Sequence, residues 1–198
     1  MIIGLDEVGR GPLAGPVVAA ATHLDWQIFP SDPKIVKKIR DSKTLTAKAR
    51  TEMAKLIREY CPYGIGEASH KEIDALGIRP ATRLAMIRAL ENLLKNFPAT
   101  VIDLLQIDGN DKFSFPYTSE DIIGGDTKIH HISAASIIAK VYRDNLMIKL
   151  AKKYPQYQFE KHKGYGTAAH LRALSTLGPC AIHRKTFGGV TEAGRLHG

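Results

Sequence analysis

The sequence predicts an α/β fold in which helices pack against a mixed central sheet. Near the N-terminus, two apolar runs flank a glycine-rich turn, a pattern typical of a strand pair. Beyond them, segments with helical periodicity alternate with shorter apolar segments. The chain has 198 residues, of which 44% are hydrophobic and 24% charged. This composition is typical of a folded globular protein that can bury a proper core.

The N-terminal strand pair comprises residues 2–5 and residues 16–22. The second run reads Pro-Val-Val-Ala-Ala-Ala-Thr, and residues 9–15, which contain three glycines, separate the two. Because the connection is short and rich in turn residues, we expect a hairpin.

The middle of the chain predicts two helices around a short strand. Residues 45–60 carry apolar side chains at steps of three and four, and Thr46 is suited to cap this helix. Residues 63–69 are a strand candidate. Residues 79–97 predict a longer helix, with Pro80 tolerated in its first turn.

Three more elements follow. Residues 100–107 form a strongly apolar segment, which predicts a core strand that ends at Asp108. Residues 133–153 and 167–177 predict helices, and the second is stopped by Gly-Pro at 178–179. The inner stripe expected for the first of these helices comprises Ala134, Ile137, Ile138, Val141 and Ile148.

Charge and composition narrow the class of protein. Lys and Arg total 28 against 20 Asp and Glu, a formal net charge of +8, which favours a polyanionic partner such as nucleic acid. Two cysteines, Cys61 and Cys180, are too few for a disulfide framework and indicate a reducing compartment. No apolar run approaches the roughly 20 residues that span a bilayer. The N-terminus does not resemble a signal peptide, so we expect a cytoplasmic protein without membrane contact.

Four acids lie at unusual places. Asp6 and Glu7 directly follow an apolar strand, Asp108 ends another, and Asp126 precedes the 133–153 helix. Carboxylates gathered in one pocket raise one another's pKa and need cations. Two divalent ions such as Mg²⁺ or Mn²⁺ would balance four of them and suit phosphodiester hydrolysis. Spacing alone leaves open the alternative that these acids are solvated strand ends.

The glycine-rich turn and one tyrosine suit contact with nucleic acid. At Gly9, Arg10 and Gly11, main-chain groups can approach a sugar without an intervening Cβ, although a tight turn would equally explain the glycines. Tyr165 lies between two glycines and could stack on a sugar or base, or be an ordinary core tyrosine.

A polar stripe on the 133–153 helix suits phosphate binding. Ser136, Lys140 and Arg143 follow one another at helical spacings of four and three. They could hold consecutive phosphates, whereas a solvated helix face is the usual alternative.

Several motifs, in order along the chain, resemble those of bacterial ribonuclease HII. The resemblance extends from residue 2 to about residue 191. The matching segments are 4–17, 41–45, 107–109, 125–126, 133–144, 163–167 and 183–187. One departure is Gly77, where the family often has asparagine.

The resemblance implies a ribonuclease H-like fold forming a single domain over residues 1–198, with residues from about 150 to 198 as a small helical C-terminal portion. It implies an endonuclease that cleaves the RNA strand of RNA·DNA hybrids. Such an enzyme also nicks duplex DNA on the 5′ side of an embedded ribonucleotide, leaving 3′-hydroxyl and 5′-phosphate ends. We expect it to act as a monomer.

The family's site residues carry over to matching positions. The catalytic and metal-binding quartet falls on Asp6, Glu7, Asp108 and Asp126, with two Mg²⁺ or Mn²⁺ ions. The residues expected to contact substrate are Gly9, Arg10, Gly11, Ser42, Lys43, Ser136, Lys140, Arg143 and Tyr165. Two alternatives stay open: a non-catalytic, basic nucleic-acid-binding module whose acids are structural, and a different metal-dependent nuclease on the same fold.

Overall fold

The computed structural model describes residues 1–30, 32–40 and 44–197, so the predicted substrate residues Ser42 and Lys43 lie outside the described residues. The strands are β1 (Ile2–Val8), β2 (Val17–Thr22), β3 (Tyr63–Ala68), β4 (Leu104–Asp108) and β5 (Ser119–Ile122). The helices are α1 (Pro33–Arg40), α2 (Ala47–Tyr60), α3 (His70–Leu76), α4 (Ile78–Asn96), α5 (Gly125–Lys128), α6 (His130–Ala151), the 3₁₀ turn η2 (Pro155–Tyr157), α7 (Phe159–His162), α8 (Ala168–Leu177) and α9 (Val190–His197).

The strands form one mixed sheet in the order β3-β2-β1-β4-β5. β1 pairs with β2 as an antiparallel hairpin, and β2 pairs with β3 in the same sense. On the other side, β1, β4 and β5 run parallel. The predicted hairpin and mixed sheet are therefore confirmed, and β1 lies at the centre of the sheet.

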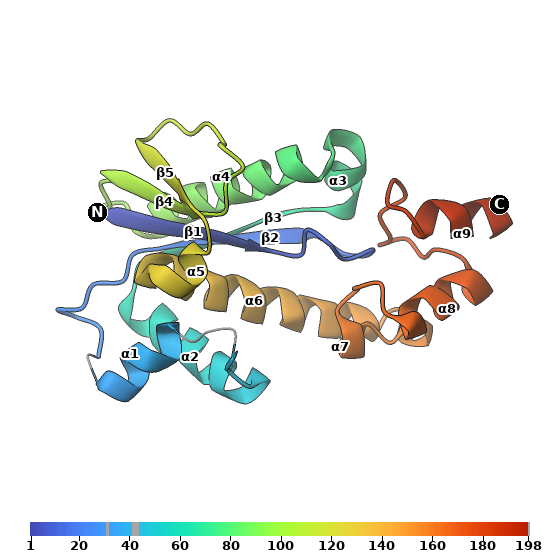
Figure 1. Cartoon of the computed structure of the whole chain (residues 1–198), viewed down its shortest axis with the longest axis horizontal. Coiled ribbons are helices and arrows are strands. Elements are labelled where there is room, and N and C mark those ends of the chain that lie inside the picture. Colours follow the sequence, from blue (N-terminus) through green and yellow to red (C-terminus); the bar gives the residue numbers. More distant parts are fainter. Residues whose placement is uncertain (31, 41–43, 198) are drawn as a thin grey trace.

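Helices cover both faces of this sheet (Figure 1). α4 packs on one face, where Ile3 and Leu5 of β1 lie in one apolar cluster with its side chains. α6 and α2 cover the other face, which receives Val18 and Ala20 of β2. Glycines in β3 bring α4 very close, because a Cβ added at Gly66 would lie 2.2 Å from a main-chain oxygen of that helix. Alternating strand residues thus feed two separate cores.

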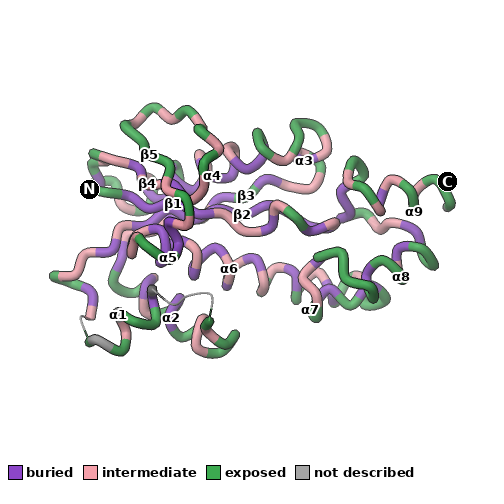
Figure 2. Tube along the Cα trace, in the orientation of Figure 1, coloured by how far each residue is buried: buried purple, intermediate pink, exposed green. Residues whose placement is uncertain are grey.

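The C-terminal helices lie beyond one end of the sheet, at the turn that joins β1 to β2 (Figure 1). An apolar cluster unites Ala14 of that turn with Met147 on α6 and with Phe159 and Ile182 of the C-terminal segment. Figure 2 shows buried residues where this segment meets α6 and exposed ones along the outer sides of α8 and α9. The expected helical C-terminal portion is present, and it supports the turn between β1 and β2.

Several details differ from the expectation. The apolar segment 100–107 forms a strand only from Leu104, and Ile148, expected on the inner stripe of α6, is 40% exposed. Thr46 does cap α2, accepting a hydrogen bond from the Ala49 N–H. In the described part of the chain, no helix is both long and apolar enough to cross a membrane.

Candidate active site

Three of the four predicted acids meet at the carboxyl ends of the neighbouring strands β1 and β4. β1 and β4 are parallel neighbours with Leu5 opposite Ile107, so Asp6 and Asp108 follow at matching positions. The short helix α5 brings Asp126 to the same place, and its N–H donates to Asp108 Oδ1 at 3.4 Å. One carboxylate oxygen from each of the three lies within 4.8 Å of the others.

The environment of Asp6 favours a nearby cation. Burial, followed by the negative charges of Glu7 and Asp108, raises the pKa of Asp6 well above its ordinary value, although a hydrogen bond from Ser136 opposes this. Asp6 is only 5% exposed, and Asp126 is only 3% exposed. Buried carboxylates in such a group are stabilised as anions by a divalent cation, and hard oxygen ligands are those that Mg²⁺ and Mn²⁺ prefer. The donor set therefore fits a metal ion of this kind.

Glu7, the fourth predicted acid, lies beside this group rather than within it. It follows Asp6 directly in β1, so the two side chains leave the strand in opposite directions. Burial raises the pKa of Glu7, and the negative charge of Asp108 adds to the shift, whereas Arg10 lowers it. Glu7 is therefore close enough to Asp108 to feel its charge.

Arg10 links Glu7 to an acid that the sequence analysis did not single out. Its guanidinium donates to Asp111 and lies 3.5 Å from a Glu7 oxygen. Asp111 also accepts from Arg79 Nε at 2.9 Å. Burial would raise the pKa of Asp111, but these two arginines lower it overall. The sequence offered no signal for this pair, because an acid three residues after a strand is ordinary in a loop.

The glycine-rich turn meets Tyr165, as a shared substrate surface would require. Gly11 is exposed, and a Cβ built on it would lie 4.0 Å from the ring of Tyr165, a residue that is 40% exposed. The Leu13 N–H donates to the Gly164 oxygen at 2.8 Å and ties the two segments together. Lys140 Nζ lies 6.0 Å from the centre of the tyrosine ring. These residues, distant in sequence, form one surface.

The polar stripe of α6 divides into three different environments. Ser136 donates to Asp6, and Lys140 forms an ion pair with Asp144 at 2.9 Å while its side chain stays 30% exposed. Arg143 is fully buried. The phosphate contact expected of Arg143 is therefore wrong for this structure. Its guanidinium instead donates to the main-chain oxygens of Ala14, Pro16 and Lys163 at 3.0–3.1 Å.

A buried histidine pair supports the segment that carries Tyr165. The Cys180 N–H donates to His183 Nδ1 at 2.9 Å, so the His183 proton lies on Nε2 and points at His170 Nε2, 3.0 Å away. The other His170 nitrogen then donates to the Tyr165 oxygen at 2.9 Å. This chain of hydrogen bonds requires both rings to be neutral.

Acid is expected to destabilise the protein through this pair. Burial, and then the neighbouring His170, lower the pKa of His183 to about 4. The unfolded chain, with an ordinary value of about 6.5, binds this proton first as the pH falls. The stability from the neutral ring is therefore complete above about pH 6.5 and is lost progressively towards pH 4, by up to about 3 kcal/mol. An NMR titration of the His183 ring should show no protonation between pH 8 and 5; a midpoint near 6.5 would contradict the neutral pair.

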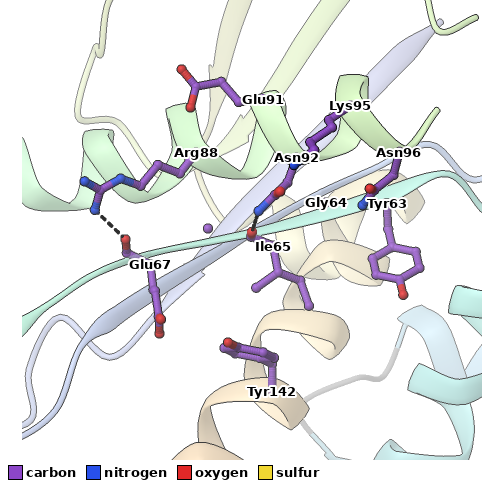
Figure 3. Close-up of a pocket in the computed structure, with 11 residues that line it drawn as sticks. Tyr63, Gly64, Ile65, Glu67, Arg88, Glu91, Asn92, Lys95, Asn96 and Tyr142 are labelled. Carbon is purple, nitrogen blue, oxygen red and sulfur yellow. Dashed lines mark hydrogen bonds between the residues drawn. The ribbon is translucent and has the colours of Figure 1, made fainter. Parts of the chain in front are cut away.

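A cavity of about 680 Å³ lies between β3 and α4 (Figure 3). Asp6, Asp108 and Asp126 do not line it. It follows the outer edge of β3, where Arg88 donates to the Glu67 oxygen at 2.8 Å and Asn92 donates to the Ile65 oxygen at 2.6 Å. These side chains satisfy main-chain groups of an edge strand, which is a common protection against pairing with another chain. The carboxylate group, not this hollow, is the better candidate for catalysis.

Comparison with known proteins agrees with the geometry. The sequence model of the family described as Ribonuclease HII matches residues 3–190. A protein named Ribonuclease HII from Paraburkholderia xenovorans (strain LB400) is 47% identical over 194 residues, which are 98% of this chain and 74% of that protein.

Two solved structures share the fold. The crystal structure of ribonuclease H2 from Pyrococcus horikoshii OT3 superposes with a TM-score of 0.78 at 24% identity, covering 98% of this chain and 97% of that one. Bst-RNase HIII in complex with Mn²⁺ gives a TM-score of 0.72 at 19% identity, over 98% of this chain and 69% of that one. From the family match and the sequence identity, the chain belongs to the ribonuclease HII family, enzymes of the ribonuclease H type that act on RNA paired with DNA.

Proposed function

We propose that the protein is a metal-dependent endonuclease that cleaves the RNA strand of RNA·DNA hybrids and nicks duplex DNA on the 5′ side of an embedded ribonucleotide. The products would carry 3′-hydroxyl and 5′-phosphate ends. The observation that carries the proposal is that one carboxylate oxygen from each of Asp6, Asp108 and Asp126 lies within 4.8 Å of the others. These acids lie at the carboxyl end of β1, the strand that leads into the glycine-rich turn.

Asp6, Asp108 and Asp126 would hold the metal ions, with Glu7 as a fourth acid beside them. The donors are carboxylate oxygens, which suit Mg²⁺ or Mn²⁺, and a structural neighbour was crystallised with Mn²⁺. A pair of such ions supplies activation of the attacking water and stabilisation of the leaving oxygen. Ser136 would hold Asp6 in place through its hydrogen bond.

The turn at Gly9–Gly11 would detect the 2′-hydroxyl, and Tyr165 would stack on an adjacent sugar or base. Support comes from the exposure of Gly11 and of Tyr165 and from the contact between their segments. Ser42 and Lys43, outside the described residues, stay candidates for contact with the substrate backbone.

The described residues of one chain bring the three acids, the glycine-rich turn and the segment of Tyr165 together, so we expect a monomer in which residues 1–198 act as a single domain. Cys61 and Cys180 are free thiols, which supports a reducing compartment such as the cytoplasm.

The test is a labelled DNA duplex containing one ribonucleotide, incubated with Mg²⁺, with Mn²⁺ or with a chelator. We expect a single nick on the 5′ side of the ribonucleotide in either metal, none in chelator, and none in the all-DNA duplex. Cleavage that persists in chelator, or equal cleavage of all-DNA duplex, would refute the proposal. Tight binding without cleavage in either metal would favour the non-catalytic nucleic-acid-binding module instead.

Lys140 is expected to contact a phosphate of the substrate. Its side chain is partly exposed beside Tyr165, so Lys140→Ala should remove about one released counterion and lower the salt dependence of binding by about one unit of slope. The measurement is duplex binding in chelator between about 50 and 200 mM salt. Lys149→Ala, which removes the same charge from an exposed position further along α6, should leave the slope nearly unchanged. Equal slopes for the wild type and Lys140→Ala would return Lys140 to a solvated helix face.

A further inference from the structure

Arg184, which the sequence analysis left without a role, is fully buried under the glycine-rich turn. Its three guanidinium nitrogens donate to main-chain oxygens of that turn: Nη2 to Gly9 at 2.6 Å, Nη1 to Arg10 at 2.8 Å and Nε to Gly15 at 2.9 Å. Its own N–H donates to the Leu13 oxygen at 2.9 Å. Arg184, from the C-terminal segment, thus donates four hydrogen bonds to main-chain oxygens of the turn.

These contacts fix which way two peptide groups face. In a planar trans peptide the C=O and the following N–H point in opposite directions. With the Gly9 oxygen turned inward to Arg184, the Arg10 N–H points away from Arg184, and the same holds for the Arg10 oxygen and the Gly11 N–H. Among the described residues, neither N–H donates to a protein acceptor. The turn therefore offers two N–H donors rather than carbonyl oxygens to a molecule seated against Gly11.

Among the described residues, the hydrogen bonds to the Gly9 and Arg10 oxygens come from Arg184. Gly9 has φ +95°, and because glycine has no Cβ, other backbone conformations at this position cost little. Arg143 holds the far end of the turn, through Ala14 and Pro16, and does not donate to Gly9 or Arg10. Loss of Arg184 would let the two peptides turn over and present oxygens to the substrate.

We infer that Arg184 is a positioning residue that sets selectivity for ribose, because it holds the Arg10 and Gly11 N–H groups toward the 2′-hydroxyl. The inference rests on the proposed function of the turn. Arg184 itself would touch neither the substrate nor the metal ions.

The test compares the binding of two duplexes, one all-DNA and one with a single ribonucleotide, in chelator so that neither is cut. The wild type should bind the ribonucleotide duplex more tightly. Arg184→Lys keeps the charge but cannot reach three oxygens in the same geometry. It should lower the ratio of the Kd for the all-DNA duplex to the Kd for the ribonucleotide duplex by about tenfold, or to one where the wild-type ratio is smaller than about ten. Affinity for the all-DNA duplex should stay within about twofold, because phosphate contacts carry it.

A matched control separates positioning from simple loss of stability. Tyr157→Phe removes a buried hydrogen bond to the Gly178 oxygen within the C-terminal segment, far in sequence from the turn. It should lower Tm yet preserve the Kd ratio. Should Arg184→Lys fail to fold, Arg184→Gln, which is neutral and keeps two donors, takes its place.

The possible outcomes distinguish the sensing of ribose by the turn from the role of Arg184. Equal binding of both duplexes by the wild type would remove the proposed sensing of ribose altogether. A wild-type ratio retained in both Arg184 variants, with discrimination present in the wild type, would overturn only the role of Arg184. An equal loss of the ratio in Tyr157→Phe would make that role merely structural.

Discussion

Asp108→Asn should abolish cleavage in Mg²⁺ and in Mn²⁺, by at least about a hundredfold to a thousandfold, while the protein stays folded. Asparagine keeps the shape of the side chain but removes the negative charge that would share cations with Asp6 and Asp126. Because the negative charge of Asp108 raises the pKa of Asp6, its removal also relieves repulsion within the apoprotein. Tm measured in chelator should therefore be unchanged or higher than that of the wild type.

Asp121→Asn is the matched control for this change. Asp121 lies on β5, opposite Ile107, and is exposed. The substitution removes the same charge from the neighbouring strand without touching the three acids, so cleavage should stay within about twofold. Cleavage by Asp108→Asn at the wild-type rate would mean that the ligand set is wrong. A fall in Tm together with activity would instead point to a structural role of Asp108.

The sheet could be predicted where sequence alone determines burial. The apolar runs of β1 and β2 and the turn between them predict a hairpin, and the structure has it. β5 could not be found in this way, since Ser119–Ile122 is polar and mostly exposed and forms a strand only because it pairs with β4. The parallel order of β1 and β4 likewise depends on how α4 crosses between distant segments.

The same distinction explains the site. Asp6 and Asp108 each follow an apolar strand, so parallel pairing of those strands brings them together. The burial of Arg143 depends on main-chain oxygens contributed by segments more than 100 residues earlier and about 20 residues later. Spacing along α6 gives no information about those segments. Arg184 was missed for the same reason, because its acceptors lie about 170 residues away.

Gly9→Ala should cause the largest combined loss of stability and of selectivity for ribonucleotides. Gly9 has φ +95°, which alanine tolerates poorly, and an added Cβ would lie 2.1 Å from Nε of the buried Arg143. That guanidinium cannot move aside without abandoning its hydrogen bonds to main-chain oxygens. We expect the free energy of unfolding to fall by about 3–5 kcal/mol, measured by urea denaturation.

Gly77→Ala separates the strain of the backbone from this collision. Gly77 has a similar φ of +84°, but a Cβ added there meets nothing within 4 Å. Its cost should be the strain alone, about 1–3 kcal/mol, and the preference for ribonucleotide duplex should be unchanged. If Gly9→Ala lowers the free energy of unfolding no more than Gly77→Ala does, the Arg143 side chain can move aside. The turn is then held less tightly than its hydrogen bonds indicate. If Gly9→Ala costs more yet keeps the preference for ribonucleotide duplex, the turn is rigid for stability alone, and ribose must be detected elsewhere in the site.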